Sequence, residues 1–284
     1  MGSNTSIPAN TYGTPPASTQ LISGLTVLLV VFIVLLIAEY AYFATNSAYT
    51  RFHTLIGYTA SPTNGPLVIR QNASLYPEAD PLGLSVNERT GIEFSYSFYL
   101  RVLQDTFDNS DTVKHVFHKG YSSVWPLMGP GVFIKGDTNT MRVFMSTFAN
   151  PYTYLDVKNI PVGKWFHVVI NSYKKGIDVF INGNLANRMQ FAHTLPYQNF
   201  GDVTLFANIR NVYKQVNTPA ITDSEFNING AFSGYLSNLR YARYALSTSE
   251  INALVAQGPS NTVQSVSVDT PPYLADDWWS NQTR

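Results

Sequence analysis

Two acidic residues spaced for a shared strand face are the first candidates for chemistry. A glycosidase needs two carboxylates flanking the bond that it breaks, and the chain contains one Glu-x-Asp pattern, Glu78-Ala79-Asp80. Pro81 follows this pair, and no third acid stands nearby. We therefore expect Glu78 and Asp80 to lie in a surface loop, and we expect that the protein is not an enzyme.

Three aspartates are candidate metal ligands. Asp105, Asp108 and Asp111 punctuate a segment that is typical of a loop after a strand. Carboxylate oxygens are the ligands that Ca²⁺ prefers, but the spacing differs from an EF-hand loop and no glycine stands at the turn position. The pattern is a weak calcium candidate. A solvated loop is the simpler interpretation, and we expect no cofactor.

The five histidines of the chain form no catalytic or metal-binding pattern. His115 and His118 are three residues apart, so on a strand they should face opposite sides and could not chelate one ion. His167 lies in a strand-like segment, whereas His53 and His193 are isolated. Structural roles are expected for all five. The sequence contains no nucleophile elbow, phosphate-binding loop or zinc spacing.

Three tryptophans are candidate contact residues. Trp125 lies in a segment rich in Pro and Gly, where an indole ring could stack on a sugar. Core packing or a protein contact is the simpler explanation for Trp125. Trp278 and Trp279 stand near the end of the chain. Because aromatic anchors dominate protein contacts, we expect this pair to dock the tail on the domain itself or on a neighbour.

A long apolar run sets the context for these residues. Residues 21–43, as a helix rising about 1.5 Å per residue, would reach roughly 35 Å and cross a hydrocarbon core of about 30 Å. A cleaved signal peptide would have a basic start and a shorter apolar core, but residues 1–20 contain no Lys or Arg. The pattern predicts an uncleaved single-pass transmembrane helix, with Glu39 reaching the interface.

The orientation in the membrane stays open. The first basic residue is Arg51, so the positive-inside rule places the carboxyl-terminal side in the cytosol. The amino terminus, however, fits the short pattern for myristoylation of Gly2, which would place that end in the cytosol. The N-glycosylation patterns at Asn4, Asn72 and Asn281 are equally short.

Composition excludes several classes of function. The 284 residues include 18 basic and 18 acidic ones, and no basic stripe supports nucleic-acid binding. Charged residues make up 13% of the chain and aromatic residues 14%, which is typical of a β-rich protein largely covered by partners. The chain has no cysteine, so it has no disulfide or thiolate metal site. This absence favours a reducing compartment.

The elements that must position these residues follow from the hydrophobic pattern. Residues 1–20 read as a polar tail, 44–65 as a juxtamembrane connector, 66–258 as one β-rich domain, and 259–284 as a second, extended tail. Within the domain, alternating runs predict strands at 92–102, 141–146, 166–173, 177–181, 203–207 and 234–241.

Two local signals are specific. Asn182-Gly183 is a two-residue turn that needs positive φ. Ser247-Thr-Ser-Glu250 is a capping box, followed by helical spacing and by Gly258 as a stop. The sequence therefore predicts one short helix near the carboxyl-terminal end.

Three blocks carry a resemblance to a known family. They are an early strand at 94–102, the unit 163–185 with its Trp-x-His-Val strand and hairpin, and the closing strand and helix at 234–251. In this order they resemble the laminin-G-like branch of the concanavalin A-like lectin/glucanase superfamily. Asn182 and Ser237 depart from the acids common there. The resemblance implies an all-β, two-sheet antiparallel jelly-roll sandwich, to which the apolar run adds one transmembrane helix.

The resemblance also bears on function. Many laminin-G-like domains bind sugars, peptides or proteins, and membrane-anchored versions resemble structural proteins of large double-stranded-DNA viruses. We therefore expect a minor capsid or virion membrane protein that tethers an internal bilayer to capsid proteins, with its domain on the capsid (cytosol-derived) side. The alternatives are a cell-surface lectin or adhesion receptor that binds glycan, and a membrane-bound glycan hydrolase using Glu78 or Asp80.

Overall fold

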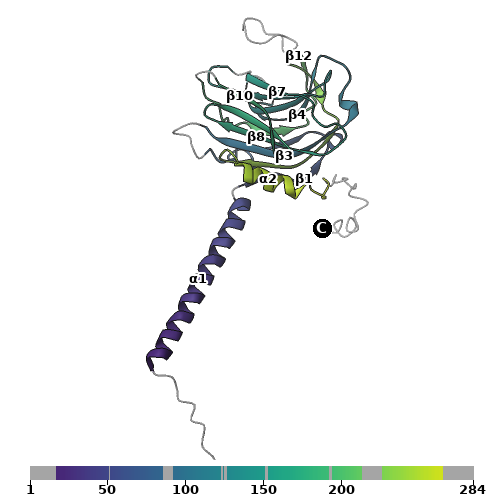
Figure 1. Cartoon of the computed structure of the whole chain (residues 1–284). Helices are drawn as coiled ribbons and strands as arrows, with labels where there is room; N and C mark the ends of the chain where they lie inside the picture. Colours follow the sequence, from purple (N-terminus) through teal and green to yellow (C-terminus); the bar gives the residue numbers. More distant parts are fainter. Residues whose placement is uncertain are drawn as a thin grey trace, which may run out of the picture. The chain divides into compact units, whose positions relative to one another are not determined.

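The computed structural model describes residues 17–50, 52–85, 92–122, 124, 127–150, 153–191, 194–212 and 226–264. The chain divides into two compact units, Met1–Thr50 and Arg51–Arg284. Figure 1 shows one long helix in the first unit, and the β-structure in the second.

The helix of the first unit is α1 (Ala17–Thr50). Its segment Leu21–Ala41 is long and apolar enough to cross a membrane, and none of it is buried. The Thr26 hydroxyl donates to the Ile22 carbonyl oxygen at 2.8 Å, so this polar group is satisfied inside the helix, as lipid requires. By length and composition, a signal sequence near the amino terminus would meet the same criterion.

One face of the second unit is a six-stranded antiparallel sheet, here called sheet A. Its strands, in spatial order, are β1 (Phe52–Ala60), β14 (Gly234–Ala242), β3 (Phe94–Val102), β8 (Phe166–Tyr173), β9 (Gly176–Ile181) and β10 (Asn184–Gln190). Strand β1 lies in the region expected to be a connector, because its β-prone residues pair along β14. The β-structure therefore begins before residue 66.

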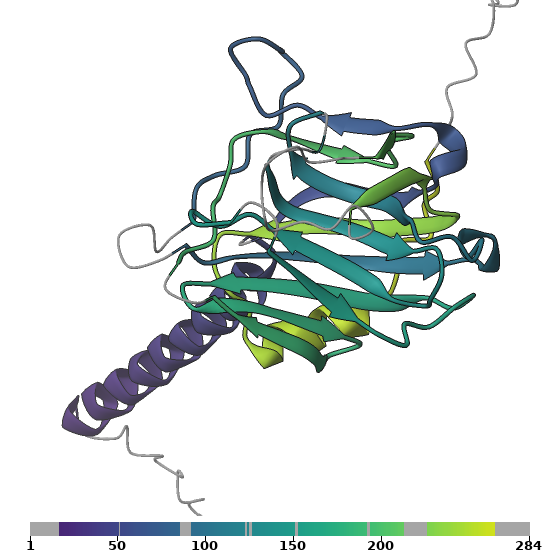
Figure 2. The ribbon, with the colours of Figure 1, turned by 90° about the horizontal axis from the view of Figure 1, so that it is seen from above.

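The other face is an eight-stranded sheet, here called sheet B, and Figure 2 shows its long strands side by side. Along its main path lie β12 (Arg210–Val212), β13 (Asn227–Ala231), β4 (Val113–Gly120), β5 (Met128–Lys135), β6 (Met141–Met145) and β7 (Thr153–Val157). Off this path, β11 (Asp202–Leu205) joins β4 to β2 (Leu67–Ile69). All pairs are antiparallel except β13 with β4. The predicted two-sheet sandwich is confirmed.

Alternation along β3 fills the core between the sheets. Phe94, Tyr96, Phe98 and Leu100 all belong to the main buried cluster, as their two-residue spacing predicts. The residues between them face outward. Among these, Tyr99 contacts helix α2 (Thr248–Gln257) through its hydroxyl.

Helix α2 covers the outer face of sheet A (Figure 1). The predicted capping box is present, with Ser247 and Glu250 each accepting from the other's backbone N–H. Ile251 and Leu254 are buried against Val169 of β8. This helix converts one outer sheet face into a second, smaller core.

The outer face of sheet B is also covered. Phe133, Phe144 and Phe226 form edge-to-face ring pairs with centroids 5.1–5.8 Å apart. They belong to a separate buried cluster, so β4, β5 and β6 are buried on both faces over most of their length. Simple alternation did not predict this second layer.

Candidate functional site

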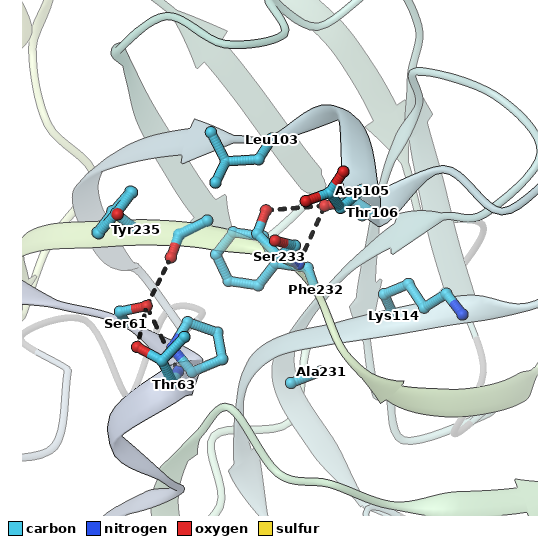
Figure 3. A pocket seen from close by; sticks show the side chains of 12 residues that line it. Ser61, Thr63, Leu103, Asp105, Thr106, Lys114, Ala231, Phe232, Ser233 and Tyr235 are labelled. Atoms are coloured by element: carbon cyan, nitrogen blue, oxygen red, sulfur yellow. Dashed lines mark hydrogen bonds between the residues drawn. The ribbon is translucent and has the colours of Figure 1, made fainter.

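A pocket of about 330 Å³ opens at one end of the sandwich (Figure 3). It lies where the chain crosses from β13 in sheet B to β14 in sheet A, beside the ends of β1 and β3. Two short 3-10 turns, η1 (Pro62–Asn64) and η2 (Gln104–Thr106), contribute to its wall. Both sheets therefore build this site.

Hydroxyl groups fix the pocket wall. Thr106 donates from its hydroxyl to the Ser233 carbonyl oxygen at 2.8 Å and accepts from the Ser233 N–H at 3.0 Å. Ser61, which caps η1, donates to the Gly234 carbonyl oxygen at 3.1 Å. These bonds, drawn in Figure 3, tie both turns to the crossover. The wall is thus preorganised and predominantly neutral.

Two charged residues, Asp105 and Lys114, line the pocket. The Lys114 ammonium lies 2.6 Å from Asp108, whose carboxylate also accepts from Ser110. The hydrogen bond from Lys114, with further help from Ser110, lowers the pKa of Asp108 to about 2. Asp105 is exposed at the rim and has no hydrogen-bond partner among the described residues. It is the carboxylate that a ligand could reach.

The three aspartates that were a weak calcium candidate lie in different surroundings. Asp105 faces the pocket, whereas Asp108 pairs with Lys114. Within the described part of the chain, no group of three or more acidic or histidine side chains is placed to hold a metal ion. Asp105, Asp108 and Asp111 are evenly spaced along η2 and the loop between η2 and β4. Their side chains nevertheless do not gather around one point.

Two aromatic rings lie beside the pocket. Tyr235 lines it, and the Tyr235 ring centroid lies 6.3 Å from that of Trp165. The Arg101 guanidinium lies 6.0 Å from the Tyr235 ring, at the edge of cation–π range. Sequence reasoning missed Tyr235 and Trp165 as site residues, because neither carries a chemical motif. Only the crossover between sheets puts this ring at a pocket.

The expectation for His115 and His118 was wrong. Their rings meet, with His115 Nε2 lying 2.7 Å from His118 Nδ1. The register of β4 against β5 shifts between His115 and Phe117, and such a bulge places residues three apart on the same side. Both rings are fully buried, so they form a structural pair that substrates do not reach.

The remaining described histidines have polar contacts. His167 Nε2 lies 2.8 Å from the Ser97 hydroxyl on the outer face of sheet A, beside the Tyr99 ring, whereas His167 Nδ1 is buried without a partner among the described residues. His53 lies 2.7 Å from Asp80. Asp80 therefore has a partner, and Glu78 is exposed in the loop, as predicted for this segment.

Several residues that the sequence singled out for contacts, lipidation, glycosylation or structural roles lie outside the described residues. These are Gly2, Trp125, His193, Trp278, Trp279 and Asn281. The start of the carboxyl-terminal tail is described, and it is held by the sandwich. The Thr59 N–H donates to the Thr262 carbonyl oxygen at 2.7 Å, and the Gln264 N–H donates to the Thr59 carbonyl oxygen at 2.9 Å. Residues 262–264 thus follow the outer edge of β1.

No family model matches the sequence, and no curated protein matches it. Similar solved structures include a botulinum neurotoxin serotype D binding domain, at 12% identity over 72% of this chain and 46% of that chain, with a TM-score of 0.48. The receptor binding domain of a mosaic serotype C/D toxin is 12% identical over 73% of this chain and 45% of that chain, with a TM-score of 0.47. The chain therefore spans less than half of each. At these identities and scores, the likeness says nothing about what this chain binds.

Proposed function

We propose that the chain is a single-pass membrane protein whose sandwich binds neighbouring molecules without catalysis. The observation that carries this proposal is the segment Leu21–Ala41, which is apolar on every side except at Glu39 near its end and contains no buried residue. A helix that is apolar all round belongs in a protein core or in lipid. The length of the apolar run favours an anchor that is kept over a signal that is removed.

Carbonate extraction of native membranes, followed by mass spectrometry of the pelleted chain, tests the anchor. The expected result is a pellet that contains the chain with peptides from before residue 41. A chain that washes into the supernatant, or a mature chain that begins after residue 41, would overturn the proposal.

The finer proposal is a concanavalin A-like, laminin-G-like domain that tethers the internal membrane of a virion to its capsid. Support comes from composition, because a chain with only 13% charged residues suits a crowded protein contact better than open solvent. The start of the tail also supports the proposal. Residues 262–264 are hydrogen-bonded to β1, so the rest of the tail begins at a fixed point on the sandwich.

Cross-linking in assembled particles tests this tether. Photo-cross-links from the tail should reach a capsid protein, and the double change Trp278→Ala/Trp279→Ala should remove them. The matched control is Gln282→Ala/Thr283→Ala in the same tail, which should keep the cross-links. Particles in which the control and the Trp variant cross-link equally would contradict the role of the two indoles.

A second candidate is a glycan-binding membrane protein, and the pocket favours it. Hydroxyl groups, the available carboxylate of Asp105 and the ring of Tyr235 are the kinds of group that recognise polar, ring-shaped ligands. A glycan array with the full chain should then give hits that Asp105→Asn and Tyr235→Ala abolish. Asp111→Asn, in the same loop but outside the pocket lining, should leave them. An array without hits would exclude this candidate.

A further inference from the structure

Three exposed aromatic side chains gather at one end of the sandwich. Tyr121, Phe148 and Phe200 are 55%, 65% and 70% exposed. They lie on three loops of sheet B, which follow β4, follow β6 and precede β11. We call these three residues the aromatic patch. Large rings left this open to water cost free energy unless something covers them.

Backbone contacts hold the three loops together. The Phe148 N–H donates to the Leu195 carbonyl oxygen at 3.1 Å, and the Phe148 ring packs edge-to-face on Tyr197 with centroids 5.0 Å apart. Asp202 pairs with Gly120 at the start of β11. The loop that contains Phe200 is therefore held to the loops of Phe148 and Tyr121 at the same end of sheet B.

The patch lies at the end of the sandwich where the chain enters it. Strand β1 begins at Phe52, which pairs with Ala242 at the end of β14. The Gln198 amide, two residues from Phe200, donates to the Tyr241 hydroxyl at 2.5 Å. This bond joins the patch-bearing loop of sheet B to the entry end of sheet A. The pocket lies at the opposite end of β1, beside Ser61.

Two lysines add positive charge at the same end. Lys174 and Lys175 form the exposed turn between β8 and β9, and Lys175 accepts a backbone hydrogen bond from Phe191 at 2.8 Å. The side chains of both lysines lack an ion-pair partner among the described residues. Aromatic rings and lysines together are what a protein presents to anionic lipid headgroups.

The linker between the apolar span and the sandwich is short. Only residues 42–51 lie between the apolar span and β1. At about 1.5 Å per residue, ten helical residues span roughly 15 Å, and even a fully extended linker of this length spans no more than about 35 Å. The headgroup layer occupies roughly 5–8 Å of that distance.

We propose that the aromatic patch and the Lys174–Lys175 turn form a lipid-contacting surface that seats the sandwich on the bilayer holding its own anchor. The rings enter the headgroup layer and the lysines pair with anionic lipid. This rests on the proposed anchor. It also orients the molecule, because the pocket and the start of the tail then lie at the end that points away from the lipid.

The absence of cysteine makes a direct test possible, since any single cysteine can be labelled without background. The full chain is placed in nanodiscs of phosphatidylcholine with phosphatidylserine, and an environment-sensitive fluorophore is attached at Phe148→Cys or Phe200→Cys. The matched control is Leu185→Cys, an exposed apolar residue at the start of β10 and at the pocket end. A third label at Leu29→Cys reports the anchor.

Lipids that carry a quencher in the headgroup region should quench the labels at Phe148 and Phe200 and leave the label at Leu185 bright. Replacing both lysines by glutamate should weaken seating by about fivefold for each positive charge removed. Quenching at Leu29 without quenching at Phe148 or Phe200 would overturn the seating and leave the anchor intact. Absence of quenching at Leu29 with acyl-chain quenchers would instead overturn the anchor.

Discussion

Two buried histidines determine each other's protonation. The Ala207 N–H donates to His115 Nδ1 at 3.0 Å, so the ring hydrogen of His115 must be on Nε2. It donates to His118 Nδ1, and His118 Nε2 in turn donates to the Tyr121 carbonyl oxygen at 2.8 Å. Each ring nitrogen is therefore fixed as either a donor or an acceptor in this series of hydrogen bonds. An added proton would remove an acceptor that a neighbouring N–H needs.

The first prediction is that acid destabilises the sandwich through these rings. Burial lowers the pKa of His118 from 6.5 to about 4 and that of His115 well below its usual value. The unfolded chain therefore binds more protons between about pH 6.5 and 4, so stability is retained above that window and falls as pH falls through it. The loss should be roughly 1.4 kcal/mol per pH unit for each histidine. Urea unfolding of the full chain in nanodiscs at several pH values measures it.

The variant His118→Gln isolates one histidine. Its amide can accept from His115 and donate to Tyr121, yet it does not protonate in this range. The dependence of the unfolding free energy on pH should become shallower by about 1.4 kcal/mol per unit below pH 6.5. An unchanged slope would mean that His118 is already charged in the folded protein.

His115 and His118 also show what could not be predicted from residue spacing. Spacing predicted the faces of Phe94, Tyr96, Phe98 and Leu100 correctly, because a regular strand keeps its two-residue period. It failed at His115, because one bulged residue reverses every later face. A bulge depends on pairing with the partner strand, so no local sequence pattern in β4 predicts it. Tyr235 was missed for a related reason, since a crossover between sheets creates its pocket.

At the level of elements, a tyrosine from the sheet terminates helix α2. The Tyr99 hydroxyl donates to the Leu254 carbonyl oxygen at 2.6 Å and accepts from the Gly258 N–H at 2.9 Å. Carbonyl groups in the last turn of a helix have no partner within the helix, so Tyr99 satisfies groups that would otherwise be buried without a bond. The amino-terminal end of α2 depends on its own Ser247, whereas this end depends on β3.

The second prediction concerns this contact. Tyr99→Phe keeps the ring in place and removes the hydroxyl, which should lower the free energy of unfolding by about 1–3 kcal/mol because buried backbone groups lose their partners. Chemical denaturation of the full chain, followed by fluorescence, measures the change. Tyr121→Phe is the matched control. Its ring is exposed, so the same chemical change there should cost close to nothing.

The elements themselves were largely predictable. Alternation identified β3, β6, β8 and β14, and the capping box identified α2. Strand β1 was missed because its neighbour β14 lies far away in the sequence, so nothing local distinguishes it from a connector. The covered outer faces were missed as well. Burial on both faces of β4 and β5 depends on loops, which carry no period.

For the whole molecule, the free energy of inserting the apolar span into the bilayer determines whether the chain stays in the membrane. Leu, Ile, Val and Phe occupy fourteen of the positions from Leu21 to Ala41. At about −0.3 to −0.6 kcal/mol each near the centre, they contribute roughly −4 to −8 kcal/mol to insertion. One arginine at the centre costs about 2.5 to 3.5 kcal/mol. A single charge is therefore tolerated, and two bring insertion close to balance.

The last prediction follows from this balance. The variant Val31→Arg should stay in the carbonate-resistant pellet, whereas Val31→Arg/Val34→Arg should lose a large part of the full-length chain to the supernatant. The matched control is Gln20→Arg, just before the span, which should behave like the unchanged chain. Retention of the double variant in the pellet would mean that the span inserts more strongly than its composition indicates. Release of the single variant would mean that the span is far weaker than its composition indicates.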